Sequence, residues 1–502
     1  MIPQKSAFVL TQYCIFGDPL SVWLLRLGAI AGIVMGCPGG WHHWLGGVVG
    51  GAPLLALGWG RPWQAQCREA LWVWIPVCLL VFLPDLTRVK VLGAGDILGG
   101  ILVAPLLPLL LTGMTLLCWQ VAGRYPVWLR PWLVASLWTG VDGLAGSLWV
   151  PLPLHWGALI YDWPGGVQVA DLGGIWLVTW VLLLVNGALS LLGALDRRSG
   201  LGIVTILGLS LGYGHWRSGQ ILAEMGRSQS FQVAAPQIVA WFDDDGSWIY
   251  RQRQHSRIQS LSQVGIRAGA ELLVWPEGAL RSAILHTWLQ TQVLDPLLPL
   301  LPRDGGLLTG ASEPVTPTTF INAALLFHPQ GHLQDRSGKQ WLFPYFESGR
   351  FVPDPSGYRP LAGGSRLGPL GVLICLESVL PAPSRALVQA GAESLMVISD
   401  DSWFGKSRWP LLHGSLSVFR AVENRRSVVF VNNTGGNLVV DPTGQIQVQG
   451  SLFVPKTVNG QVYRLSGETL ATRWGDWWVG VCWLISAVAI TGRMGGSRSQ
   501  IL

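Results

Sequence analysis

The sequence predicts two structural classes in one chain: a multi-span α-helical membrane part of about eight spans and a water-soluble α/β part. Half of the 502 residues are hydrophobic and 12% are charged, about half the usual charged share of a soluble domain. Lys and Arg are unevenly placed, with ten in residues 1–216 and twenty-two in residues 217–475. Strand patterns alternate with amphipathic helix patterns in the second of these stretches, as α/β folds require.

The membrane spans are predicted from apolar stretches close to the roughly 20 residues that cross a bilayer. About seven spans precede the soluble part and one follows it, in the stretches 27–60 (two passes), 70–84, 101–123, 131–150, 172–195, 199–216 and 477–492. Ten of twelve loop cations share one side if the N-terminus is cytoplasmic, which places the soluble part outside. The expected domains are a membrane domain at 1–216, a soluble domain at 217–475, and a last span with a short cytoplasmic tail at 476–502.

In the soluble part, apolar runs predict strands, and polar stretches with apolar positions at helical spacing predict helices. Strands are expected at 231–240, 272–275, 319–327, 372–375, 394–399 and 428–431, and helices at 247–268, 385–392 and 413–424. This alternation is typical of a layered α/β fold, in which catalytic groups often lie where strands end and loops begin.

Composition and motifs exclude several classes of protein. The net charge of +6 does not indicate nucleic-acid binding, because loop cations supply much of it and no Lys/Arg cluster is interleaved with aromatics. No Cys or His spacing suits a metal, and no phosphate-binding loop motif occurs. We therefore expect no metal, no cofactor and no nucleic-acid partner.

Three side chains of the soluble part form a set for acyl transfer through a thioester. Cys375, the single cysteine of this part, ends an apolar run, and Glu277 closes another. A thiol reacts as its thiolate, so Glu277 is the candidate base. The Lys339 ammonium, with a backbone N–H such as that of Leu376, could stabilise the oxyanion. His413 is the alternative base, in a Cys–His pair.

Taken alone, each of these residues is more often structural, but their order forms a pattern. That pattern resembles the nitrilase superfamily and, within it, its membrane branch, the apolipoprotein N-acyltransferases. The segments that carry the resemblance are Val274–Glu277, Lys339–Glu347, Cys375–Glu377, Asp401–Gly405, His413, Arg426 and Asn432–Gly435.

The resemblance implies a fold and roles for individual residues. The soluble part is expected to be an extracytoplasmic nitrilase-like αββα sandwich. Glu277 is implied as general base, Lys339 as oxyanion donor and Cys375 as nucleophile. The implied supporting acids are Glu347 and Glu377. The apolar loop residues implied to bind or gate lipid chains are Trp241, Tyr345, Phe346 and Trp403.

The resemblance also implies an activity and its partners. Cys375 would take an acyl chain from a phospholipid and pass it to the α-amino group of the N-terminal diacylglyceryl-cysteine of a lipoprotein. The implied partners are this phospholipid donor, the lipoprotein acceptor and the lipid bilayer. The implied location is the bacterial cytoplasmic (inner) membrane, with the catalytic domain on the periplasmic face.

Three other hypotheses remain open from the sequence. The first is a membrane-tethered amidase that hydrolyses a small amide with the same three residues. The second is a scaffold that has lost its chemistry, which the joint presence of Glu277, Lys339 and Cys375 disfavours. The third is a transporter with a soluble appendage, for which Asp142 and the pair His42 and His43 are the polar groups within predicted spans.

Overall fold

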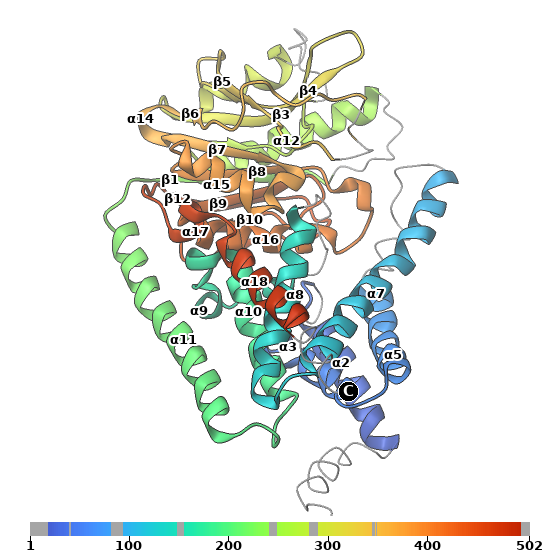
Figure 1. The fold of residues 1–502 in the computed structure, drawn as a ribbon. Coiled ribbons are helices and arrows are strands. Elements are labelled where there is room, and N and C mark those ends of the chain that lie inside the picture. The colour runs from blue at the N-terminus through green and yellow to red at the C-terminus, as the bar shows by residue number, and fades with distance from the viewer. Residues whose placement is uncertain are drawn as a thin grey trace, which may run out of the picture.

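The computed structural model describes residues 19–39, 42–81, 94–147, 155–239, 248–280, 290–343, 347 and 349–492. Strands gather in one half of the molecule, and most helices gather in the other (Figure 1). The strands belong to the expected soluble part. The helices of the other half come from the N-terminal stretch and from the C-terminal segment.

Every stretch predicted as a span contains helix in the described residues. These helices are α2 (Pro19–Gly36), α3 (Leu45–Val49), α4 (Gly51–Gly58), α5 (Trp63–Val81), α7 (Ala94–Ala122), α8 (Arg130–Ser147), α10 (Ala170–Leu189), α11 (Arg197–Met225) and α18 (Trp477–Thr491). A short helix, α9 (Pro164–Val167), precedes α10. By length and hydropathy, two of the described helices, α2 and α10, could cross a bilayer, and both lie in stretches predicted as spans. α11 continues to Met225, past the boundary expected at 216.

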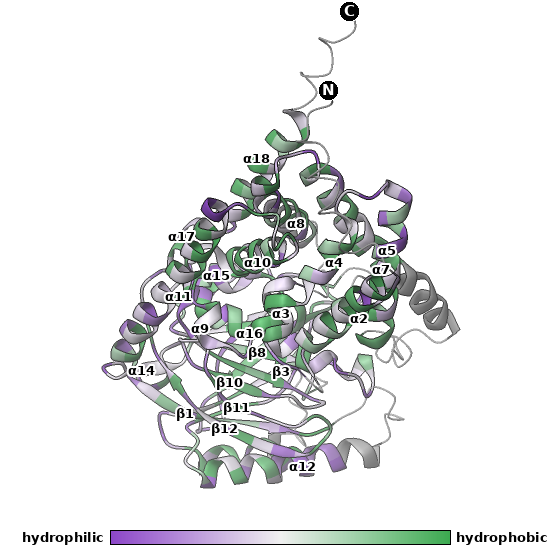
Figure 2. Ribbon diagram, turned by 90° about the horizontal axis from the view of Figure 1, so that it is seen from below, coloured by the Kyte–Doolittle hydropathy of each residue, from purple (hydrophilic) through white to green (hydrophobic). Residues whose placement is uncertain are grey.

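Apolar residues dominate these helices, whereas α12 (Trp248–Arg267) of the strand-rich half carries long hydrophilic stretches (Figure 2). α12 begins and ends close to the predicted helix at 247–268. It has a polar face because it is an outer layer of the soluble part, with Ile258 packed inward.

The soluble part contains two six-stranded sheets. The first sheet has the order β12-β1-β2-β3-β4-β5, and the second has the order β11-β10-β9-β8-β7-β6. The strands of the first sheet are β1 (Ser230–Gln237), β2 (Leu272–Val274), β3 (Gly306–Pro314), β4 (Phe320–Phe327), β5 (Leu333–Gly338) and β12 (Lys456–Tyr463). Those of the second are β6 (Leu361–Ala362), β7 (Pro369–Ile374), β8 (Ser394–Ser399), β9 (Ser427–Asn432), β10 (Leu438–Val440) and β11 (Ile446–Gln449).

The two sheets pack face to face, with helices on both outer sides. Alternate residues of a strand point to opposite faces, so Val274 and Ile374 enter the core between the sheets. Leu273 faces outward, in the core that the first sheet shares with α12. Leu373 likewise faces the helices α15 (Pro381–Gln389) and α16 (Trp409–Asn424). The expected αββα sandwich is confirmed.

The end of α16 joins the soluble part to the helical half. The Arg425 guanidinium donates to the Asp171 carboxylate at 2.7 Å, and both side chains are buried. Two residues earlier, the Glu423 carboxylate accepts a 2.9 Å hydrogen bond from the Ile175 backbone N–H. That N–H is available because the backbone of α10 leaves helical geometry at Gly174, where φ is +70°. The layer of helices below the second sheet is therefore bonded directly to α10.

Candidate active site

The ends of two strands, one from each sheet, carry the acid and the thiol that the sequence singles out. Glu277 lies just after β2, and Cys375 directly follows β7. Both strands are short apolar runs whose side chains fill the core. The chain turns away at the carboxyl end of each, where a polar side chain need not be buried in that core. Lys339 follows β5, at the edge of the first sheet.

Lys339 lies between two carboxylates, and its side chain is 2% exposed. Its ammonium Nζ is 2.8 Å from Oε2 of Glu347 and donates to Oε1 at 3.0 Å. Oε1 of Glu277 is 3.9 Å from the same nitrogen. Burial alone would lower the pKa of Lys339, but the charges of Glu277 and Glu347, and that of Cys375 when its thiol is ionised, outweigh burial and raise it above its usual range. The ammonium is therefore charged at neutral pH, and it is close enough to Cys375 for the two groups to interact electrostatically.

Hydrogen bonds fix both oxygens of the Glu277 carboxylate. Oε1 accepts from the Asn322 amide at 2.6 Å, and Oε2 accepts from the Asp400 backbone N–H at 2.9 Å. Burial is the largest cause of a shift that raises the pKa of Glu277 to about 7, and the charges of Glu347 and Asp400 add to it. A carboxylate with a pKa near neutrality can both take and return a proton, as general acid–base catalysis requires.

Cys375 occupies a strained position at a sharp turn. Its φ is +55°, a region that costs a non-glycine residue about 1–3 kcal/mol. It opens a short 3₁₀ helix, Cys375–Ser378, and is partly exposed. Burial raises the pKa of the Cys375 thiol well above its usual value, and the charge of Glu277 adds to this while Lys339 opposes it. The resting residue is therefore a neutral thiol that needs a base.

Glu377 braces the site and does not face the thiol. Oε1 accepts from the backbone N–H groups of Gln340 and Trp341, at 2.8 and 3.0 Å, and from the Tyr358 hydroxyl at 3.0 Å. Oε2 accepts from the Ile374 N–H at 2.9 Å. Glu377 thus ties the residue before the thiol to the segment that follows Lys339.

His413, the alternative base, is directed to the backbone of the nucleophile. Its Nε2 lies 3.2 Å from the carbonyl oxygen of Cys375 and 2.8 Å from Oγ of Ser378. Its Nδ1 lies 3.2 Å from both carboxylate oxygens of Asp401. The geometry therefore favours Glu277 over His413 as the base.

The structure brings together Glu277, Lys339, Cys375 and Glu347, with Glu377 as a brace. Of the predicted loop residues, Trp241, Tyr345 and Phe346 lie outside the described residues. The structure describes the backbone of Trp403, in the 3₁₀ turn Ser402–Phe404, but not its side chain. Among the residues that the structure describes, no group of three or more His, Cys, Asp or Glu could hold a metal ion.

Sequence reasoning did not assign functions to three groups that contact the site. Asn322 donates to Glu277 and, at 3.2 Å, to Glu347, so it spaces the two carboxylates. In the loop after β8, the Asp400 backbone N–H donates to Glu277, and the Asp401 carboxylate contacts the His413 ring. A polar Asn inside the otherwise apolar β4 was an available signal, because buried strands seldom include an amide without a partner.

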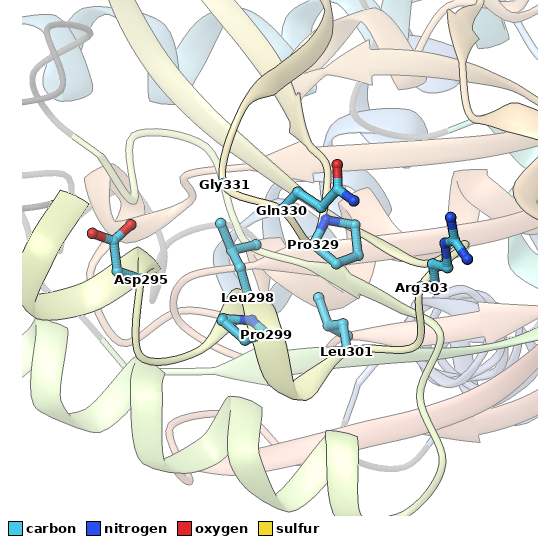
Figure 3. Close-up of a pocket in the computed structure, with 8 residues that line it drawn as sticks. All are labelled: Asp295, Leu298, Pro299, Leu301, Arg303, Pro329, Gln330 and Gly331. Atoms are coloured by element: carbon cyan, nitrogen blue, oxygen red, sulfur yellow. The ribbon is translucent and has the colours of Figure 1, made fainter.

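A separate cavity of about 630 Å³ lies in the strand-rich half of the molecule, next to β3 and β4 (Figure 3). Its lining includes Leu301 and Arg303, just before β3, and Pro329, just after β4. These are the ends of β3 and β4 opposite to the side where Glu277 follows the parallel β2. The cavity is therefore not part of the thiol site.

The chain is similar to a known protein family and to several known proteins. Residues 233–464 match the family model described as carbon-nitrogen hydrolase. An apolipoprotein N-acyltransferase of Geobacter metallireducens is 28% identical over 408 residues, which cover 73% of this chain and 74% of the relative. One of Gloeobacter violaceus is 29% identical over 396 residues, covering 73% of this chain and 72% of the relative. A crystal structure of an amidase from Nesterenkonia sp. is 23% identical, covers 51% of this chain and 97% of that chain, and has a TM-score of 0.37.

Proposed function

We propose that this chain is an apolipoprotein N-acyltransferase of the nitrilase superfamily, which transfers an acyl chain from a phospholipid, through a thioester at Cys375, to the N-terminal diacylglyceryl-cysteine of lipoproteins. One observation carries the assignment of the site. A neutral thiol, a base with a raised pKa and a charged ammonium converge at the ends of two facing sheets. The curated relatives favour this transfer over hydrolysis of a small amide.

In the first step, Glu277 takes the proton of the Cys375 thiol as the sulfur attacks the ester carbonyl of the phospholipid. Lys339 and a backbone N–H, such as that of Leu376, stabilise the negative oxygen of the tetrahedral intermediate. The ester C–O bond then breaks, and Glu277 returns the proton to the departing alkoxide. The products are a lysophospholipid and an acylated Cys375.

In the second step, the α-amino group of the acceptor attacks the thioester. Glu277 takes a proton from the attacking nitrogen, the C–S bond breaks, and the proton returns to the sulfur. The sequence from ester through thioester to amide ends at the most stable of the three bonds, so no nucleotide is needed. Glu347 keeps Lys339 charged and oriented through both steps.

The thioester must be kept from water until the amine arrives. We infer that a membrane setting serves this purpose, with about eight spans and the catalytic domain on the periplasmic face of the inner membrane. Two helices long and apolar enough to cross a bilayer support this setting, and so do exposed leucines on α11. Leu201 and Leu209 are each 67% exposed, which is favourable in lipid and unfavourable in water. Trp241, Tyr345, Phe346 and Trp403 are proposed as apolar loop residues at the lipid side of the site.

The test is mass spectrometry of lipoproteins from a bacterial host depleted of its own N-acyltransferase and supplied with this chain. We expect a third acyl chain on the lipoproteins, and its loss with Cys375→Ala. Cys67 is the matched control, because it is the other partly exposed cysteine among those described, and Cys67→Ala should keep the third chain. Lipoproteins that stay diacylated with the unchanged chain present at normal levels would contradict the proposal.

A further inference from the structure

A buried Asp–His pair lies behind the nucleophile and has no role in the two steps above. The side chains of Asp401 and His413 are both fully buried. The His413 ring is held edge-on against Phe430, with ring centroids 5.0 Å apart. Asp401 in turn accepts from the Ser399 hydroxyl at 2.9 Å and from the Asn432 amide. The ring is therefore fixed in its plane and at its Nδ1 end.

The other end of the ring acts on the main chain of the nucleophile. Nε2 lies 3.2 Å from the Cys375 carbonyl oxygen, and the Ser378 hydroxyl donates to the same oxygen at 2.9 Å. This carbonyl belongs to the residue whose φ is +55°. A carbonyl fixed on this side fixes the peptide plane, and that plane sets the direction of the Cys375 Cα–Cβ bond. Such unusual backbone geometry persists only where the surroundings over-determine it.

The same loop also holds the base. Asp401 directly follows Asp400, whose backbone N–H donates to Oε2 of Glu277 at 2.9 Å. One end of this two-residue unit therefore fixes the carboxylate. The other end, through His413, fixes the backbone of the thiol residue. Glu277 follows a strand of the first sheet, and Cys375 follows a strand of the second. Their alignment therefore depends on contacts that connect the two sheets.

We propose that Asp401 and His413 are positioning residues that, together with the Asp400 backbone N–H, hold the Cys375 sulfur in line with the Glu277 carboxylate. The inference rests on the proposed function for its biological meaning. Proton transfer between the Cys375 thiol and the Glu277 carboxylate can be measured without any lipid substrate.

The experiment uses the full chain in detergent micelles and iodoacetamide as a small probe of the thiol. The alkylation rate of Cys375 is followed by peptide mass spectrometry at pH 7.5, in the wild type and in His413→Leu, His413→Gln, Asp401→Asn and Glu277→Gln. His332, exposed on the turn after β4, supplies the matched control His332→Leu. Thermal unfolding of each variant shows which variants are folded.

We expect His413→Leu to lower the alkylation rate about 10- to 100-fold, because small displacements of reacting groups have effects of that size. The amide of His413→Gln carries both a donor and an acceptor that can replace the contacts of Nε2 with the Ser378 hydroxyl and the Cys375 carbonyl, so this variant should recover most of the rate. The double variant His413→Leu/Glu277→Gln should be no slower than Glu277→Gln alone, since both changes disrupt the same interaction, that between the Cys375 thiol and the Glu277 carboxylate. A general packing defect would instead add to the loss.

Wild-type alkylation in folded His413→Leu, or additive losses in the double variant, would overturn the proposal. If His413→Leu does not fold, Asp401→Asn takes its place, with a loss of about tenfold and the same non-additivity expected. A parallel assay measures acylation of Cys375 by vesicles of phosphatidylethanolamine and phosphatidylglycerol. A wild type that shows Glu277-dependent alkylation but no acylation would sink the proposed function and leave the positioning role standing.

Discussion

Glu277 and Glu347 show how two identical side chains acquire different roles beside one ammonium. Glu347 makes the close contact with Lys339, at 2.8 Å, whereas Glu277 is 3.9 Å away. Glu277 therefore gains less from the positive charge, and burial dominates its titration, which raises its pKa to about 7. Two carboxylates in different environments can divide the work of counter-ion and base. Asn322, which donates to both, keeps them apart.

This division predicts how the acylation of Cys375 depends on pH. Glu277 accepts the thiol proton only when ionised, so the acylation rate should fall about tenfold per pH unit below its pKa of about 7 and level off above it. Lys339 does not titrate in this range, because its pKa lies above its usual value. The measurement is single-turnover acyl-enzyme formation between pH 5.5 and 9, followed by intact-protein mass spectrometry. Glu277→Gln is the control, and its residual rate should lack this inflection. A flat profile in the wild type would exclude Glu277 as the base.

At the scale of elements, the sequence predicted the strands that end at the active site but not the two edge strands of the first sheet. β2, β7, β8 and β9 are apolar enough to be predicted, because each is buried on both faces. β5 and β12 are the edge strands of the first sheet, and their polar sequences resemble loops.

The contacts within the site were less predictable than its members. Glu277, Lys339 and Cys375 could be selected by residue type and motif order. The contact of Asn322 with Glu277 depends on where β4 lies relative to β2, with β3 between them, and no local pattern encodes that placement. The direction of the His413 ring depends on Asp401, twelve residues away on another element. Sequence spacing gives neither orientation.

The junction between α16 and α10 should contribute measurably to stability. Asp171→Ala leaves the buried Arg425 guanidinium without its carboxylate, and breaking such a buried pair typically costs about 3–5 kcal/mol. The exposed pair Arg473–Glu468, with the Arg 63% exposed, is the matched comparison, and Glu468→Ala should cost about 1 kcal/mol or less. Thermal unfolding in detergent, monitored by circular dichroism, checks both. Equal small losses would show that α16 is not anchored through this pair.

At the scale of the whole molecule, one continuous apolar core runs from the helical half into the second sheet. Trp176 of α10, Phe419 of α16 and Phe430 of β9 all belong to it. Cys375, at the end of β7, packs against this core, so packed layers of described residues connect the nucleophile to α10. If α10 crosses the bilayer, the height of Cys375 above the membrane is set by the fold. A lipid-anchored donor and a lipid-anchored acceptor would then meet the sulfur at one depth.

The proposed orientation makes this arrangement testable with an impermeant maleimide on spheroplasts. In a background with Cys67→Ser and Cys375→Ser, Val315→Cys places a thiol on the turn after β3, and Leu192→Cys places one between α10 and α11; both positions are exposed. Arg197 and Arg198 follow the second position, and positive residues favour the cytoplasmic side. We expect Val315→Cys to be labelled on intact spheroplasts and Leu192→Cys to be labelled only after permeabilisation. The reverse pattern would invert the topology. Labelling of both on intact spheroplasts would mean that α11 does not separate the two sites across a bilayer, and the thioester would then lack the lipid setting that protects it from water.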